Sequence, residues 1–107
     1  MNVLFVCSMN HDRSRTAEEI FRGRPGIEVR SAGIRGWARV RIDDELVEWA
    51  DIIIVMEGFH KEYIRRTFPN HAQGKRIEIL GIPDQYLYMD PALVDRLEKA
   101  TTKILDI

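Results

Sequence analysis

The sequence contains one cysteine, three histidines and no long apolar run. A single cysteine cannot form an internal disulfide, and three scattered histidines beside it give no zinc-ligand spacing. No stretch of about 18 apolar residues and no signal peptide are found, and the net charge is −1, so neither a membrane nor a nucleic-acid partner is predicted. These absences predict a cytoplasmic protein that uses no metal and no other cofactor.

The composition is that of an ordinary globular domain, with 45% hydrophobic and 31% charged residues in 107 positions. No repeat or linker divides the chain, so residues 1–107 are expected to form one domain. The charges are uneven, because residues 1–42 hold eight arginines and four acids, whereas residues 43–107 hold eight basic and thirteen acidic residues. The basic part could face an anionic ligand, or its arginines could simply be solvated.

Apolar strand patterns alternate with helical patterns along the whole chain, which predicts an α/β fold with a parallel sheet. The continuous apolar run at 51–56 is typical of a central strand, whereas the alternation at 27–31 is typical of an edge strand. Strands are expected at 2–6, 27–31, 51–56 and 76–82, and helices at 14–22, 45–49, 60–68 and 91–104.

The stretch from Cys7 to Ser14 joins the first strand to the first helix and carries the clearest chemical signal. Cys7 and Arg13 are separated by five residues, and a loop of that length can direct its backbone N–H groups at an oxyanion. The helix N-terminus and the Arg13 guanidinium would add positive potential, which favours the thiolate form of Cys7. A thiolate nucleophile facing a phosphoryl group is one interpretation. The other is a small buried hydrophobic side chain at a strand end.

This stretch resembles the loop Cys-x-Gly-Asn-x-Cys-Arg-Ser that follows the first strand of low-molecular-weight protein tyrosine phosphatases. The matching positions are Cys7, Asn10, Arg13 and Ser14, while Met9 replaces the glycine and Asp12 the second cysteine. Further matches are Ser31-Ala32-Gly33, Trp37, the run 50–56 and an aspartate after the fourth strand. With 107 residues the chain would be a short variant of the family.

The resemblance implies a three-layer α/β/α domain with a four-stranded parallel sheet of order 2-1-3-4. It implies that Cys7 is the nucleophile, that Arg13 binds phosphate and that an aspartate is the general acid. The other residues that it assigns to substrate binding are Ser8, Met9, Asn10, His11, Asp12 and Ser14 in the loop, with Trp37 and Tyr86 as pocket walls. These aromatic residues, and Tyr88, could equally be half-buried packing residues.

Two aspartates compete for the role of general acid. Asp84 lies two residues beyond the expected fourth strand, so it can overhang a loop at the neighbouring strand end, and Tyr86 follows it. Asp90 precedes Pro91, as the family's acid precedes a proline, but an Asp-Pro pair is also what an N-cap followed by the first helical residue looks like. In the family that the chain resembles, the acid precedes an aromatic pair and lies before a second aspartate that caps a helix, and this resemblance in order favours Asp84.

The sequence therefore predicts a cysteine-dependent phosphatase acting on phosphotyrosine in proteins or on small aryl phosphates, with inorganic phosphate as product. Two alternatives remain open: an arsenate reductase that borrows an external thiol, and a non-catalytic phosphate- or phosphotyrosine-binding module. Met9 would cost about 1 kcal/mol if its position required a positive φ. Asp12 would oppose an anion unless it points outward.

Overall fold

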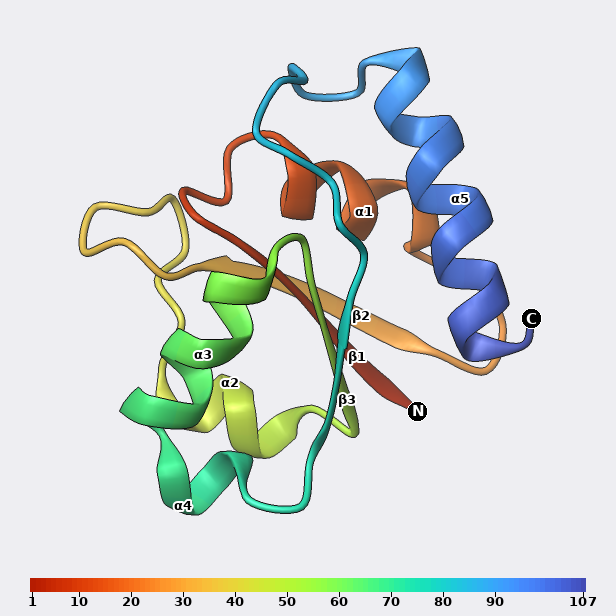
Figure 1. Ribbon diagram of the computed structural model, residues 1–107. Coiled ribbons are helices and arrows are strands. Elements are labelled where there is room, and N and C mark those ends of the chain that lie inside the picture. The colour runs from red at the N-terminus through yellow and green to blue at the C-terminus, as the bar shows by residue number, and fades with distance from the viewer.

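The computed structural model describes all residues from Met1 to Ile107. Four strands form one parallel sheet in the order β2-β1-β3-β4, covered by helices on both faces (Figure 1). The strands are β1 (Asn2–Cys7), β2 (Glu28–Gly33), β3 (Ile52–Val55) and β4 (Arg76–Ile79). The predicted fold class and strand order are confirmed, with the apolar strand at the centre and the alternating strand at an edge.

The helices divide into two layers (Figure 1). On one face lie α1 (Arg13–Phe21) and α5 (Pro91–Leu105), and on the other lie α2 (Asp44–Trp49), α3 (Gly58–Thr67) and α4 (Pro69–Ala72). None of them is long and apolar enough to span a membrane.

The two central strands alternate their side chains between two apolar clusters, because successive residues of a strand point to opposite faces. In β1, Val3 and Phe5 pack against α1 and α5, whereas Leu4 and Val6 pack against the layer of α2, α3 and α4. All four side chains have no exposed surface. The sheet is therefore fixed on both faces, which makes the carboxyl end of β1 a rigid origin for the loop that follows it.

Element boundaries differ from the predicted ones where capping or a turn intervenes. Helix α3 begins at Gly58, before the expected residue 60, because Glu57 and His60 form a capping box. Helical structure resumes after Thr67, because Pro69 is well suited to the first position of α4. Strand β4 ends at Ile79, short of the expected residue 82, and Gly81 beyond it has φ 71°, a left-handed value that breaks an extended strand.

The order of the strands reverses between β1 and β3, since the chain moves to one side of β1 for β2 and to the other side for β3 and β4. In open parallel sheets, ligands bind outside the carboxyl ends of the strands at such a point. The loop after Cys7 leaves the sheet at this place.

Candidate functional site

The loop from Cys7 to Ser14, here called the phosphate loop, wraps between the end of β1 and the start of α1. Its turn depends on Asn10, which is fully buried and has φ 58°. Asparagine tolerates this left-handed backbone better than most residues. Met9 does not have a positive φ, so the backbone strain that a positive φ would have caused there does not arise.

The sulfur of Cys7 lies between two hydrogen-bond partners. The backbone N–H of Asn10 donates to Cys7 Sγ at 3.2 Å, and Ser14 Oγ lies 2.9 Å from the same sulfur. Cys7 is 2% exposed and lines a cavity of about 200 Å³ at the end of β1. The Asn10 N–H is thus a fixed donor to the sulfur, and the Ser14 hydroxyl is placed to be a second one.

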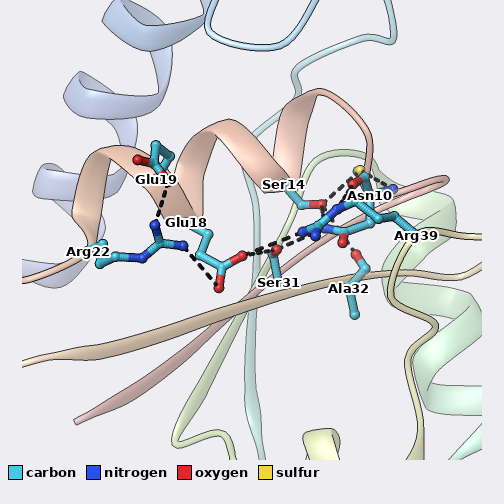
Figure 2. Close-up of polar contacts among 9 residues, drawn as sticks. Asn10, Ser14, Glu18, Glu19, Arg22, Ser31, Ala32 and Arg39 are labelled. Atoms are coloured by element: carbon cyan, nitrogen blue, oxygen red, sulfur yellow. Dashed lines mark hydrogen bonds and ion pairs between the residues drawn. The ribbon is translucent and has the colours of Figure 1, made fainter.

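A chain of hydrogen bonds behind the loop sets the direction of the Ser14 hydroxyl (Figure 2). Ser31 Oγ donates to the Glu18 carboxylate at 2.5 Å, so the Ser31 oxygen accepts from Asn10 Nδ2 at 2.9 Å. The other proton of the same amide goes to Ser14 Oγ at 2.7 Å. Because Ser14 accepts there, its own proton is left for Cys7 Sγ or, in a longer contact of 3.3 Å, for the carbonyl of Ala32.

Arg13 begins α1 and is only 2% exposed. Its Nη1 donates to the Glu57 carboxylate at 2.6 Å and to the carbonyl of Ile82 at 2.9 Å, which fixes the guanidinium plane. Its Nε lies 3.8 Å from Asp84 Oδ1, beyond hydrogen-bond distance. Nε and Nη2 therefore keep donors free, and these two nitrogens form the fork with which arginine binds two oxygens of one anion.

His60, in α3, contacts the phosphate loop at Ser8. Its Nδ1 accepts from the backbone N–H of Glu57 at 3.0 Å, so a neutral ring carries its proton on Nε2, which lies 3.0 Å from Ser8 Oγ. Burial, together with the positive charges of Arg13 and Arg35, lowers the pKa of His60 to about 4. The ring is therefore neutral near pH 7 and donates to Ser8.

The two candidate acids lie in different environments. Asp84 lines the same cavity as Cys7 and Arg13, and its carboxylate is 66% exposed. Asp90 is the N-cap of α5, with its side chain accepting from the Ala92 N–H at 2.9 Å and Pro91 at the first helical position. The geometry thus brings Asp84 to the cavity and gives Asp90 the helix-capping position that the Asp-Pro pair suggested.

Met9, His11 and Asp12 line the cavity together with Cys7, Arg13 and Asp84, whereas Ser8, Asn10 and Ser14, also expected to bind substrate, are not part of its lining. Asp12 Oδ1 accepts from the Tyr88 N–H at 2.8 Å, so its carboxylate is held against the 84–90 segment and not turned into the nest of amides. Larger cavities exist, such as one of about 580 Å³ between the start of α2 and the α3–α4 junction, but Cys7 lines none of these.

The predicted aromatic walls lie outside the lining of this cavity. Trp37 is 75% exposed in the segment 34–41, which joins β2 to the region before α2. Tyr86 packs against the core, and a hydrogen bond of 2.9 Å from Arg96 lowers the pKa of its hydroxyl. Tyr88 stacks under the Arg15 guanidinium at 4.2 Å.

Gly33, at the end of β2, allows the backbone of the phosphate loop to pack closely against it. It pairs with Cys7 across the sheet, and a methyl group added to it would lie 2.6 Å from the Ser8 carbonyl oxygen and 2.9 Å from the Asn10 nitrogen. Segment 34–41 backs the loop further, because Arg39 N donates to the Met9 carbonyl at 3.0 Å and Arg39 Nε to the Asn10 carbonyl at 3.0 Å.

Four residues of the site are absent from the sequence prediction: Glu18, Arg39, Glu57 and His60. A signal for Glu57 was available, because it follows the strand that pairs with β1 and so must lie beside the end of β1. Glu18 faces Ser31 across an α1–β2 packing contact, and no local pattern predicts that pairing.

No protein-family model and no curated protein matches the sequence. Solved structures do match over nearly the whole chain. The tyrosine phosphatase Wzb from Escherichia coli K30, in complex with phosphate, is 25% identical, covers 98% of this chain and 96% of its own, and has a TM-score of 0.79. The low-molecular-weight protein tyrosine phosphatase from T. tengcongensis is 21% identical, with coverages of 100% and 99% and a TM-score of 0.74. The arginine phosphatase YwlE, as a cysteine-to-serine variant with a phosphorylated active-site serine, is 23% identical, with coverages of 99% and 94% and a TM-score of 0.75.

Proposed function

The chain has the fold of the low-molecular-weight protein tyrosine phosphatases, and from this premise we propose that it hydrolyses phosphomonoesters through a phosphocysteine on Cys7. The observation that carries the proposal is the convergence of Cys7, Arg13 and Asp84 on one cavity. A nucleophile, an oxyanion-binding fork and a carboxyl group are the three parts that metal-independent phosphoryl transfer through cysteine needs.

In the first step the Cys7 thiolate attacks phosphorus in line with the leaving oxygen. The S–P bond forms, the P–O bond breaks, and Asp84 in its acid form gives its proton to the leaving oxygen. The loop amides and the free Nε and Nη2 donors of Arg13 hold the equatorial oxygens, whose charge is largest in the transition state. Ser14, directed by Asn10, donates to the sulfur and stabilises it as a thiolate.

In the second step a water molecule attacks phosphorus, and the Asp84 carboxylate accepts its proton. The S–P bond breaks, which returns the thiolate of Cys7 and releases inorganic phosphate. The exposure of Asp84, 66%, supports this double role because both leaving group and water can reach it. A thiol nucleophile works only while reduced, so the proposal also places the protein in the cytoplasm.

For the substrate we propose phosphotyrosine, by the resemblance of the loop and the likeness to tyrosine phosphatases such as Wzb. The likeness to the arginine phosphatase YwlE makes phosphoarginine the natural comparison. Rates of phosphate release from two peptides that differ only in phosphotyrosine or phosphoarginine decide between them. A kcat/KM at least tenfold higher for the phosphotyrosine peptide supports the proposal, and the reverse order contradicts it.

Hydrolysis of p-nitrophenyl phosphate by four proteins tests the mechanism: the wild type and the variants Cys7→Ser, Asp84→Asn and Asp90→Asn. Cys7→Ser should abolish turnover, and Asp84→Asn should lower kcat by about 10²–10⁴. Asp90→Asn is a matched control, because asparagine caps a helix about as well as aspartate, so its kcat should equal that of the wild type. An inactive wild type that binds phosphate would indicate a binding module, and full activity of Cys7→Ser would overturn the covalent step.

A further inference from the structure

A groove of about 440 Å³ runs between α1 and the edge strand β2, beside the phosphate loop. Its lining is rich in charge, with four arginines and two glutamates: Arg15, Arg22, Arg30, Arg39, Glu18 and Glu19. The groove is therefore positive overall. It holds half of the eight arginines in residues 1–42, the part of the chain whose excess of positive charge was left unexplained by the sequence.

Both glutamates of the groove already have partners (Figure 2). Glu18 accepts from Ser31 and lies 3.8 Å from Arg39 Nη2 and 3.9 Å from Arg22 Nη2. Glu19 accepts from Arg22 Nη1 at 2.6 Å. Arg22 is thus neutralised by two neighbours, and Arg39 is partly neutralised by one.

Arg15 and Arg30 form no salt bridge, although both line the groove. Each is held by an aromatic ring instead: the Arg15 guanidinium lies 4.2 Å from the centre of the Tyr88 ring, and that of Arg30 lies 4.3 Å from the centre of the Trp49 ring. Stacking fixes the plane of a guanidinium and leaves the N–H groups at its edge free. The groove therefore has an oriented, unpaired cation on its α1 side and another on its β2 side.

The groove and the cavity at Cys7 lie next to each other, because residues that line one contact residues that line the other. Tyr88, which lines the groove, donates its backbone N–H to Asp12 at 2.8 Å, and Asp12 lines the cavity. Arg39, on the other side of the groove, bonds to the carbonyl of Met9, also a cavity residue. Because lining residues of the groove contact lining residues of the cavity on both sides, we expect the residues that flank a phosphorylated side chain bound at Cys7 to reach the groove.

We propose that this groove binds acidic side chains that flank the phosphorylated residue, so that the substrates are phosphoproteins with aspartate- or glutamate-rich segments at the site of modification. The carboxylates occupy the free edges of Arg15 and Arg30, in bidentate geometry. This inference rests on the proposed phosphatase function. It explains why these arginines have rings as partners and no carboxylates from their own chain.

The test compares two phosphotyrosine peptides of equal length, one with glutamate and one with glutamine at the flanking positions. Each exposed ion pair should raise kcat/KM only a few-fold, so two pairs together should favour the acidic peptide by roughly tenfold at low salt. This preference should shrink as the salt concentration increases. The double variant Arg15→Gln/Arg30→Gln should bring the ratio of the two kcat/KM values close to one. The matched control Lys61→Gln/Arg66→Gln removes the same charge from α3, across the sheet, and should keep the wild-type ratio.

p-Nitrophenyl phosphate, which has no flanking residues, separates this inference from the proposed function. A wild type that hydrolyses it but treats both peptides alike would overturn the groove as a recognition surface and leave the phosphatase function standing. A preference for the acidic peptide that survives Arg15→Gln/Arg30→Gln would also overturn it. If the protein hydrolyses none of the substrates, fluorescence anisotropy gives the affinities of the two peptides for the Cys7→Ser variant. Tighter binding of the acidic peptide supports recognition by the groove, and equal affinities refute it.

Discussion

Replacing Gly33 with alanine should damage the site without touching a catalytic group. Gly33 has no positive φ, so alanine can adopt its backbone conformation and the effect is purely steric. The added methyl would lie 2.6 Å from the Ser8 carbonyl oxygen, 2.8 Å from Ala38 Cβ and 2.9 Å from the Asn10 nitrogen. Two of these three atoms belong to the backbone of the phosphate loop, which must therefore move by several tenths of an ångström.

The magnitude follows from how tightly the loop is held. Overpacking of a well-packed interior costs about 1–3 kcal/mol, which lowers the Tm of a domain of this size by roughly 5–20 °C. Displacing a catalytic loop by a distance approaching 1 Å reduces rates by about 10²-fold. We therefore expect Gly33→Ala to lower both the Tm and the kcat/KM for p-nitrophenyl phosphate.

Gly36→Ala is the matched control, because Gly36 also lacks a positive φ and a methyl group there would meet nothing within 4 Å. Thermal unfolding followed by circular dichroism and initial-rate kinetics should leave this variant close to the wild type. The reasoning would be refuted if Gly33→Ala kept the wild-type Tm and kcat/KM, or if Gly36→Ala lost as much as Gly33→Ala.

Three further predictions concern the residues behind the loop. Below pH 6.5 the unfolded chain protonates His60, whereas the folded chain does so only near its pKa of about 4. The free energy of unfolding should thus fall by up to about 3 kcal/mol as the pH drops between these values, and urea titrations should show this slope reduced in His60→Gln. Asn10→Gly keeps the left-handed backbone but loses two buried hydrogen bonds, which should cost about 1–3 kcal/mol of stability. Asn10→Ala should cost about 1 kcal/mol more, because alanine disfavours the positive φ of position 10. Equal losses of stability in the two variants would contradict the backbone argument. In Glu18→Gln, Ser31 is no longer compelled to donate to residue 18, so the hydrogen bonds that direct the Ser14 proton weaken and kcat should fall by about tenfold. Glu19→Gln is the control and should retain the wild-type kcat, because Glu19 pairs only with Arg22. A change in KM with no fall in kcat would contradict a role of Glu18 in directing the Ser14 proton.

The sequence by itself determined the fold class and the position of the loop. Strand and helix periodicities are local properties, and the apolar run at 51–56 is typical of a strand buried on both faces. The resemblance of the loop then supplied the order of strands, which the structure confirms. The N-cap role of Asp90 was likewise predictable, because capping depends on neighbours in sequence.

The tertiary structure alone decided which residues surround the loop. Glu57 at the start of α3, His60 in α3 and Arg39 in the segment after β2 contact the loop, and Glu18 in α1 is connected to it through Ser31. Contacts across such separations depend on how the layers pack, which no window of sequence contains. It also decided a point that the sequence left open, since the left-handed residue is Asn10 and Met9 has no positive φ. A motif fixes which side chains are present, but the direction of a hydroxyl proton or a guanidinium edge is set by partners that only the folded chain brings within hydrogen-bond distance.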